Sequence, residues 1–588
     1  MMRTRILAGL LFLVAPALSR ADADLAQEKK NDVLVRALVD ELERGKVGLK
    51  LEGLERPYFI EYALQDRSTG SVSAVLGSVT NRSENRSRGL RVDVRVGSYE
   101  LDNRNFSGGG GRSRFGRGFA ARMGGSIPID DDYNAIRQSI WWATDRDYKS
   151  VIETLEQKKA FMESKVIENK PDDHARAPAV LHFDGRTDTN IPLDRLEKTV
   201  VGLSAIFREC PAVLRSSVSL SGTGGNDYLV NTEGTRLRTS NLSYSLAITA
   251  TVQADDGMKL TDSISIQTRS LDDLPSLAEM EKRCREMVAK LVAVKEAPIL
   301  ESYTGPVLVD APAAAALFSG QFASRFAGGQ RALGGRTPPE DFENKLGKRI
   351  LPKFLNVVDD PTRSSIAGTP VMGHYRYDQE GVEVRPVVLV ENGYLKTLVM
   401  SRNPSKKLSE STGHGRGMFQ PSASTGCLIV TSNQGASDEA LKEKLIELFE
   451  DEDLEFGIRI ASLGATGAGA ASGRLAQLMA RFGGSLGGLM GASATPLAMY
   501  KVYPDGREEL VRGAEFARIG LKAFKRIQAA GMEPYVQNTG GALEGSTIAA
   551  PSFVFEELDL AKIDRDFDKP PILPSPLARA DAVKGVEN

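Results

Sequence analysis

Apolar residues follow two different spacings along this chain, and the spacing changes from one segment to the next. In Asp32 to Leu51, Asp132 to Val166 and Ser276 to Lys295 they recur at helical intervals, with charged residues between them. In Val92 to Val96 they alternate with Asp and Arg, which is the period of a half-buried strand. Helices and strands mixed in this order predict an α+β fold.

The length of 588 residues favours more than one domain. We expect an N-terminal α+β domain over residues 24–300, with separate strands at Tyr58 to Leu64 and Ser71 to Val79. A strand-rich C-terminal domain is expected over residues 301–588, carrying an insertion rich in Gly and Ala at residues 464–496.

Three local patterns are expected within the C-terminal domain. Asn392-Gly393 lies between two apolar runs and predicts a tight β-hairpin, because a type I′ turn needs positive φ at both residues. Ala311 to Phe326 is rich in alanine and predicts a helix. Phe516 to Ile527 has apolar residues at helical spacing and predicts another helix, closed by Gly531.

Other segments allow a functional interpretation beside a structural one. Ser107 to Gly118 is basic and rich in glycine, but it lacks the Gly-Lys-Ser/Thr of a phosphate loop, so a mobile loop is favoured. Trp141 and Trp142 could line a groove, although anchoring of their helix in a core is the favoured role. For Gly464 to Pro496, an apolar lid or docking element and a flexible surface insertion are held equally.

The first 23 residues have the pattern of an export signal. Arg3 and Arg5 precede the apolar run Ile6 to Leu18, and small residues follow up to Ala23. The run is shorter than the roughly 20 residues that span a membrane. We therefore expect residues 1–23 to be a signal peptide and the mature protein to be exported, to a periplasm or to the exterior. No later segment predicts a stable membrane span.

Composition limits the partners and the chemistry. Lys and Arg number 75 against 77 Asp and Glu, so there is no basic excess and no nucleic-acid partner is expected. The chain has only four histidines, which are His174, His182, His374 and His414. None of them has the HExxH spacing of a zinc peptidase. Gly483 to Gly487 match G-x-S-x-G, but no strand precedes them and no histidine follows, so a hydrolase triad is excluded. Cys427 opens an apolar run and is expected to be a buried, structural thiol.

Several motifs, collinear along the chain, resemble the TldD/PmbA family. The run from Val388 to Gly417 resembles the family hairpin followed by Ser-Thr-Gly-x-Gly-Arg, here Ser411-Thr412-Gly413-His414-Gly415-Arg416. Leu229 to Arg236 resembles the family's Asn-Ser-Glu-Gly-Thr turn. Trp142 to Ala160 resembles a helix of exported members, and Pro551 to Leu560 resembles the closing strand. The resemblance covers most of the chain after about residue 30.

The resemblance implies a two-domain TldD/PmbA-like fold and a peptidase-related function. The family's active subunit carries HExxxH on a helix and a cysteine nearer the C-terminus. It pairs with a sister subunit that lacks these ligands, and together they enclose a cleft for peptides or unfolded chains.

This sequence departs from the family's zinc motif. In the corresponding helix, Ser319 and Ser324 stand at the two histidine positions and Gly320 stands at the glutamate. The region of the family cysteine, Val536 to Thr547, contains no cysteine. Serine hydroxyls are poor zinc ligands, and glycine cannot act as a base. We therefore expect no catalytic residue, no metal ligand and no cofactor on this chain, with zinc held only by a homologous partner.

The leading hypothesis is the non-zinc subunit, of PmbA/TldE type, of an exported peptidase that acts on peptides or unfolded chains. Its partner would be a zinc-bearing TldD-like subunit or a second copy of itself. The candidate peptide-binding residues are Ser319, Gly320, Ser324, His414 and Arg416, although a structural role is favoured for each one singly. The alternative is a non-catalytic peptide-binding or scaffold homodimer, and an active hydrolase with unusual ligands is least favoured.

Overall fold

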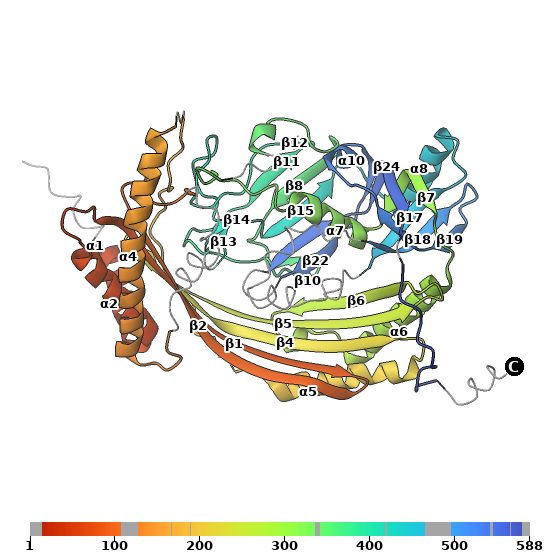
Figure 1. Ribbon diagram of the computed structural model, residues 1–588, viewed down its shortest axis with the longest axis horizontal. Coiled ribbons are helices and arrows are strands. Elements are labelled where there is room, and N and C mark those ends of the chain that lie inside the picture. Colours follow the sequence, from red (N-terminus) through yellow and green to blue (C-terminus); the bar gives the residue numbers. More distant parts are fainter. Residues whose placement is uncertain are drawn as a thin grey trace, which may run out of the picture.

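The N-terminal part of the protein is built on one long, curved β-sheet (Figure 1). The structure is a computed structural model that describes residues 15–107, 127–165, 167, 169–187, 190–335, 342–417, 420–464, 495–540, 545–564 and 566–578. The sheet has the order β2-β1-β4-β5-β3, and β6 also pairs with β5. Its strands are β1 (Pro57–Val75), β2 (Ser78–Val96), β3 (Leu181–Phe183), β4 (Arg215–Asn231), β5 (Arg236–Gln253) and β6 (Lys259–Thr268).

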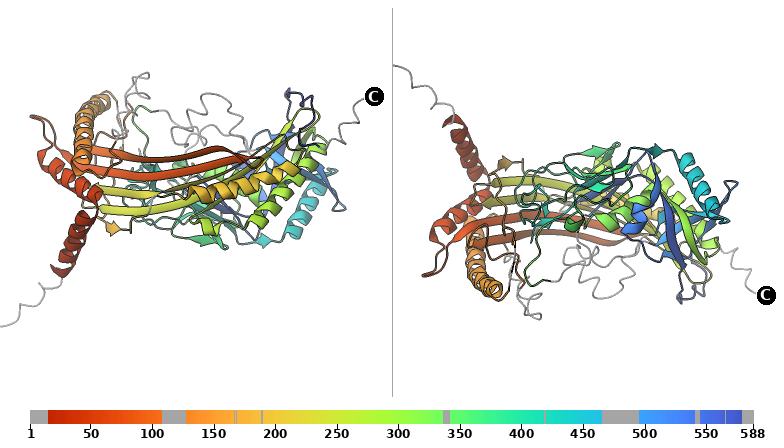
Figure 2. Two further views of the ribbon diagram at one scale, coloured as in Figure 1. Left: turned by 90° about the horizontal axis from the view of Figure 1, so that it is seen from below. Right: turned by 90° about the horizontal axis from the view of Figure 1, so that it is seen from above.

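Helices cover one end and one face of this sheet. They are α1 (Ala15–Asn31), α2 (Val33–Gly48), α4 (Tyr133–Glu163), α5 (Leu193–Ala205) and α6 (Leu277–Glu296), with short 3-10 turns at Ile206–Glu209 and Leu271–Asp273. Figures 1 and 2 show α5 and α6 against the outer face, α2 and α4 at one end of the strands, and the C-terminal part over the inner face. An apolar core that includes Leu196, Leu246 and Leu291 joins the outer face to α5 and α6.

The strand β1 is continuous across a stretch where the sequence predicts a break. Residues 65–70 are polar and separate two apolar runs, which predicts two strands, and this prediction is wrong. The polar stretch stays in the strand because its charges are paired; Asp66, for example, accepts from Arg88 at 3.1 Å. The turn comes later, at Leu76 and Gly77, which both have positive φ.

The charged face of β2 is buried, although the alternating pattern predicts that it faces water. Arg91 and Asp93 alternate with the core valines, yet both are buried. Arg91 pairs with Glu61 at 2.9 Å and donates to the carbonyl of Gln379 at 2.8 Å. The charges of this face are therefore satisfied by an ion pair within the sheet and by a hydrogen bond to the C-terminal part in place of water.

In its described residues, the C-terminal part is built on two larger sheets of order β12-β11-β8-β15-β23-β22 and β16-β21-β24-β7-β17-β18-β19, with β20 on β24. The small pairs β9-β10 and β13-β14 lie outside them. The strands are β7 (Ser302–Val309), β8 (Leu355–Asp359), β9 (Ser365–Ile366), β10 (Thr369–Pro370), β11 (Val387–Glu391), β12 (Tyr394–Leu395), β13 (Gly415–Arg416), β14 (Ser422–Ala423), β15 (Cys427–Ser432), β16 (Gly435–Ala436), β17 (Gly457–Leu463), β18 (Pro496–Val502), β19 (Glu508–Val511), β20 (Ala514–Phe516), β21 (Ile527–Gly531), β22 (Tyr535–Thr539), β23 (Ser546–Ala550) and β24 (Phe553–Lys562).

Helix α7 joins the two C-terminal sheets in one apolar core. The helices of this part are α7 (Ala311–Phe322), α8 (Asp438–Asp451) and α10 (Leu521–Lys525), with a 3-10 turn at Glu343–Lys345. Phe318 and Phe322 of α7 are fully buried beside Leu428 of one sheet and Phe553 of the other. The expected α+β fold, with a mixed N-terminal part and a strand-rich C-terminal part, is confirmed.

Two predicted helical features differ in the structure. Trp141 and Trp142 do not anchor α4 in the core; they are 41% and 56% exposed, because the buried stripe of α4 runs through Ile136, Ile140 and Tyr148 instead. The helix predicted over Phe516 to Ile527 is also wrong. Only the five residues of α10 are helical there, between strands β20 and β21. The apolar residues of the segment pack in the core from all three elements.

The segment predicted to be an export signal, residues 1–23, lies largely outside the described residues, since the structure describes the chain from residue 15. In the described part of the chain, none of the helices combines the length and the apolar character that crossing a bilayer demands.

The predicted turn at Asn392-Gly393 is confirmed between β11 and β12. Asn392 has a φ of 49° and Gly393 a φ of 79°, as a type I′ turn requires. A Cβ atom on Gly393 would also collide with the carbonyl oxygens of Leu351 and Pro352. Both backbone conformation and space therefore require glycine at this position.

We predict that Gly393→Ala lowers the free energy of unfolding by about 2–3 kcal/mol, because strain at positive φ adds to the collision. The matched control is Gly506→Ala, where φ is 80° but the Cβ position is open. That variant is expected to lose only about 1 kcal/mol. Urea unfolding followed by far-UV circular dichroism measures both losses, and equal losses would contradict the prediction.

Candidate functional site

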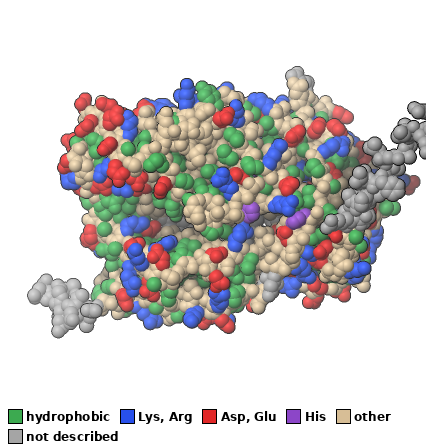
Figure 3. Space-filling model, turned by 180° about the vertical axis from the view of Figure 1, so that it is seen from behind, with side chains coloured by type: hydrophobic (Ala, Val, Ile, Leu, Met, Phe, Trp, Pro, Cys, Tyr) green, Lys and Arg blue, Asp and Glu red, His purple; other side chains and the backbone are tan. Residues whose placement is uncertain are grey.

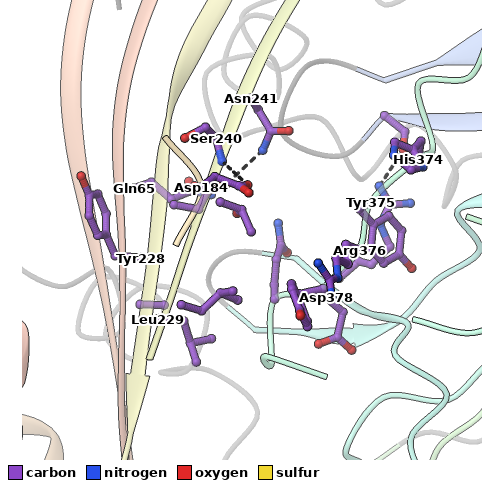
Figure 4. Close-up of a pocket in the computed structure, with 18 of the residues that line it drawn as sticks. Gln65, Asp184, Tyr228, Leu229, Ser240, Asn241, His374, Tyr375, Arg376 and Asp378 are labelled. Carbon is purple, nitrogen blue, oxygen red and sulfur yellow. Dashed lines mark hydrogen bonds between the residues drawn. The ribbon is translucent and has the colours of Figure 1, made fainter. Parts of the chain in front are cut away.

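A pocket of about 360 Å³ lies between the long sheet and the C-terminal part. Figure 3 shows the surface hollowed there, with histidine, lysine and arginine side chains beside the hollow. Figure 4 shows residues of the sheet, among them Asn241 and Leu229, facing the segment from His374 to Asp378. The pocket thus has one wall from each part of the protein.

The strand β5 has an open edge at this pocket. On one side β5 pairs with β4 from Arg236 to Thr251. On its other side, the pairing with β3 ends at Arg238 and the pairing with β6 begins at Tyr244. Within the described chain, the residues between them, Thr239 to Ser243, pair with β4 alone, and all of them line the pocket. Backbone groups on the free side of a strand can pair with another extended chain.

Asp184 and His182 stand at the β3 end of the open edge. His182 Nε2 lies 2.8 Å from Asp184 Oδ1, and the amide of Ser240 donates to Asp184 Oδ2 at 3.3 Å. The ring centroid of Tyr377 lies 5.2 Å from that of His182. These contacts hold a carboxylate and an imidazole in the pocket wall.

Two buried carboxyl groups support the opposite wall. Asp378 accepts the amides of Glu380 and Val382, both at 2.9 Å, and the amide of Gly415 at 2.8 Å. Glu380 Oε2 accepts the amide of Arg402 at 2.6 Å. Burial, followed by repulsion from the Asp378 carboxylate, raises the pKa of Glu380 to about 7. A carboxyl group whose pKa is raised toward neutral pH therefore lies behind this wall of the pocket.

The residues of the motif Ser411 to Arg416 have different structural roles, and its two glycines allow close packing. Gly413 has a φ of 76°, and a Cβ on it would lie 2.6 Å from the carbonyl oxygen of Glu383. A Cβ on Gly415 would collide with the Glu380 carboxylate. The two glycines are therefore needed because the segment packs closely against residues 380–384.

His414 and Arg416 differ in exposure, since His414 is buried and Arg416 lines the pocket. His414 is fully buried; its Nδ1 is 2.9 Å from the hydroxyl of Thr412, and its Nε2 is 3.4 Å from Asp359 Oδ2 without the alignment of a hydrogen bond. Arg416 reaches the pocket and donates to the carbonyl of Gly545 at 2.6 Å. Of the predicted site residues, only Arg416 lines the pocket.

The residues at the zinc-motif positions lie away from the pocket. Ser319 and Gly320 are in the last turn of α7, and Ser324 is in the turn that follows. Ser319 is half-buried, whereas Gly320 and Ser324 are exposed, and a Cβ on Gly320 would meet nothing within 4 Å. A contact of these three residues with a peptide stays a prediction.

The residues at these positions do not fit a zinc ion. Two hydroxyl groups and a glycine offer neither an imidazole nor a carboxylate. Across the residues that the structure describes, no group of three or more His, Cys, Asp or Glu could hold a metal ion. The donor set of Ser319, Gly320 and Ser324 therefore differs in kind from that of a zinc peptidase.

Other candidates from the sequence do not join the pocket. Cys427 is fully buried at the start of β15, and burial, followed by the charge of Asp359, raises the pKa of its thiol to about 12. The prediction of a structural thiol agrees with this position. Gly483 to Gly487, nearly all of the insertion 464–496, and the loop Ser107 to Gly118 beyond its first residue lie outside the described residues, so both interpretations of the insertion stay open.

Sequence reasoning missed most of this pocket. It weighed His182 and His374 only as metal ligands, and it did not single out Asp184 or the edge of β5. The alternating residues of β5 carry a strand signal, but the open edge depends on where β3 and β6 end. The strand β6 directly follows β5 in the chain, but β3 lies before β4, so no local pattern marks the gap between them.

Comparisons with known proteins agree with the motifs. Residues 302–459 match the family model for the PmbA/TldA metallopeptidase C-terminal domain. A metalloprotease of Methanocaldococcus jannaschii is 35% identical over 105 residues, which is 17% of this chain and 22% of the relative. A metalloprotease of Methanothermobacter thermautotrophicus is 26% identical over 209 residues, which is 35% of this chain and 43% of the relative. The chain thus matches less than half the length of either relative.

The fold also has solved counterparts. The crystal structure of TldE from Thermococcus kodakarensis superposes with a TM-score of 0.55 at 15% identity. The superposition covers 89% of this chain and 100% of that chain. At this identity the likeness establishes the fold alone.

Proposed function

Because the chain belongs to the TldD/PmbA family, we propose that it is the subunit without zinc of an exported metallopeptidase of this family. Its role is to hold an extended peptide or an unfolded chain, while a homologous zinc-bearing partner subunit cleaves it. The observation that carries the proposal is the pocket, in which the open edge of β5, Thr239 to Ser243, faces the C-terminal part.

Strand addition explains how such an edge holds many sequences. The backbone of an extended peptide pairs with the backbone of β5, so affinity does not depend on particular side chains. The odd-numbered residues of β5 here, such as Thr239 and Asn241, alternate with those that enter the core under the sheet, such as Tyr244 and Leu246. They present short polar side chains to the bound peptide.

The donor set supports placing the zinc on the partner. Ser319, Gly320 and Ser324 cannot replace HExxxH, because hydroxyl groups bind zinc poorly and glycine has no side chain to act as a base. A peptide-holding chain without its own metal needs a catalytic partner, and a homologous subunit is the natural one for this family. The export signal at residues 1–23 supports a location outside the cytoplasm.

Peptide binding predicts a local change in hydrogen exchange. Saturating dansyl-tetra-alanine is expected to slow amide exchange of Leu242 by at least about tenfold, because its amide faces the open side of β5, whereas the Ser240 amide already donates to Asp184. The internal control is β2 (Ser78–Val96), the strand at the opposite edge of the same sheet. Exchange measured by mass spectrometry that slows in β2 and not in β5, or in neither, would contradict strand addition at this pocket.

The subunit role is tested by co-purification. The tagged protein is isolated from native periplasmic extract, partners are identified by mass spectrometry, and zinc is measured in the eluate and in the protein purified alone. A co-eluting homologue with HExxxH, together with zinc that is absent from the lone protein, supports the proposal. Elution only with itself and without metal favours the scaffold homodimer, and stoichiometric zinc on the lone protein overturns both.

A further inference from the structure

Arg269 is a half-buried cation in the pocket wall, placed at the β6 end of the open edge. It directly follows Thr268, the β6 residue that pairs with Tyr244. Its Nη2 donates to the carbonyls of His374 at 3.1 Å and Val371 at 3.5 Å. No carboxylate among the described residues pairs with it, and burial alone lowers the pKa of its guanidinium. Its guanidinium is thus partly removed from water, and no described carboxylate compensates its charge.

Arg416 is a second half-buried cation in the pocket wall. It donates to the carbonyls of Thr425 at 2.8 Å and Gly545 at 2.6 Å, and no described carboxylate pairs with it. The Cβ position of Gly545 lies 2.6 Å from the carbonyl oxygen of Met372. Arg269 therefore contacts the segment 371–374 directly, whereas Arg416 contacts Gly545, which packs closely against Met372 of that segment.

The acidic residues of the pocket do not balance these cations. Asp184 is engaged by His182, and Asp227 forms an ion pair with Arg67. Asp378 accepts three backbone amides. Arg91, which also lines the pocket, is already paired with Glu61. The surplus of positive charge is thus concentrated at Arg269 and Arg416.

The placement of the charges gives the open edge a direction. Asp184 lies at its β3 end and Arg269 at its β6 end. From Arg238 to Tyr244 is six residue steps, or about 20 Å of strand, which suits a segment of four to five residues. A peptide whose carboxylate lies at Arg269 runs parallel to β5, in the direction that β3 already has.

We propose that Arg269 and Arg416 bind the C-terminal carboxylate of the peptide, so that the pocket selects short extended peptides with a free C-terminus. Guanidinium groups match the planar, bidentate geometry of a carboxylate. Both side chains have donors left after their carbonyl contacts, since a guanidinium carries five. This inference rests on the proposed peptide-holding function and adds the substrate class and the binding direction.

The test compares two probes on the intact wild-type protein by fluorescence anisotropy. Dansyl-tetra-alanine with a free C-terminus is expected to bind at least about tenfold more tightly than its C-terminal amide, a difference typical of a charge-assisted pair. Arg269→Gln and Arg416→Gln are each expected to remove most of that preference for the free acid over the amide. Arg363→Gln, which removes an exposed cation paired with Asp360 away from the pocket, is the charge-matched control and should keep the preference.

The outcomes separate this inference from the function on which it rests. Equal binding of acid and amide overturns carboxylate recognition but leaves peptide holding intact. Failure of both probes to bind overturns both. An amide probe that ends in glutamate and binds as tightly as the free acid assigns the arginines to side-chain carboxylates and overturns the C-terminal assignment. Because acid and amide are compared on the wild-type protein, the result stands even if a variant misfolds.

Discussion

Replacement of Arg402 by methionine is expected to lower the free energy of unfolding by about 3–5 kcal/mol, the cost of breaking a buried ion pair. Arg402 is 2% exposed, and both of its terminal nitrogens donate to the Glu233 carboxylate at 2.7 Å. Its side chain also donates to the carbonyl of Ala175 at 2.9 Å from Nε and 2.8 Å from Nη2. Methionine fills much of the volume but leaves the Glu233 charge without its cation.

The large effect is expected because this contact joins the two parts of the protein. Arg402 belongs to the C-terminal part, whereas Ala175 and Glu233 belong to the N-terminal part. The backbone contact from the amide of Ala175 to the carbonyl of Arg402, at 2.9 Å, remains in the variant. The measured loss therefore reports the side chain and not the removal of the whole junction.

Urea unfolding followed by far-UV circular dichroism checks this prediction. The control is Arg376→Met, which removes an ion pair with Glu383 at 3.3 Å in which both side chains are 61% exposed. This variant is expected to lower the free energy of unfolding by less than about 1 kcal/mol. Adding Glu233→Gln to Arg402→Met should recover part of the loss, because the unpaired charge is then removed. A loss under about 1 kcal/mol for Arg402→Met would contradict the structural role.

The sequence predicted those elements whose residues interact locally. The helix α4 begins at its predicted start because Asp132 caps it, accepting the amide of Ala135 at 2.7 Å. The hairpin at Asn392-Gly393 follows from backbone conformations that two residues alone decide. In both cases the physical cause lies within a few neighbouring positions.

The errors come from residues whose role depends on distant partners. The polar centre of β1 is stable in a strand because its charges have partners on other strands, such as Arg88 of β2 for Asp66 and Asp227 of β4 for Arg67. The charged face of β2 is buried only because Gln379 and its neighbours cover it. Trp141 and Trp142 are exposed because the rest of the protein packs on another stripe of α4.

The site was foreseen only in part, for the same physical reason. The resemblance identified Arg416, which lines the pocket. It also identified His414, which is fully buried and does not line the pocket. Asp184, Arg269 and the edge of β5 stand in no motif, because the pocket forms only where the sheet and the C-terminal part meet. The residues that line a pocket at such an interface can be identified only when the pairing of the strands is known.

The second large effect is expected in the dependence of stability on pH, and Glu380 is its source. Burial, followed by repulsion from Asp378, raises the pKa of Glu380 from 4.5 to about 7 on folding. Between these two values the folded protein holds a proton that the unfolded chain has released. Stability from this group is therefore complete below about pH 4.5 and is lost as the pH rises to about 7.

The difference between wild type and Glu380→Gln reports the contribution of Glu380 together with its repulsion by Asp378. Glutamine keeps an oxygen that can accept the amide of Arg402, at 2.6 Å in the wild type, but it cannot lose a proton. Relative to the variant, the wild type is expected to lose about 2–3 kcal/mol of stability between pH 5 and pH 8. Urea unfolding of both proteins at a series of pH values gives this difference directly.

Glu383→Gln is the matched control, because Glu383 lies three residues away but is 61% exposed in its pair with Arg376. Its difference from wild type should change by under about 1 kcal/mol over the same range. A flat difference for Glu380→Gln, or one that rises with pH, would mean that the carboxyl group stays ionised in the folded protein. In that case Arg402 and Arg95, whose charges act on Glu380, outweigh its burial, and a second negative charge stands beside that of Asp378 at neutral pH. Such a charge close to the pocket would oppose a bound carboxylate, so the pH dependence of Glu380 and the preference for a free C-terminus are linked through one wall.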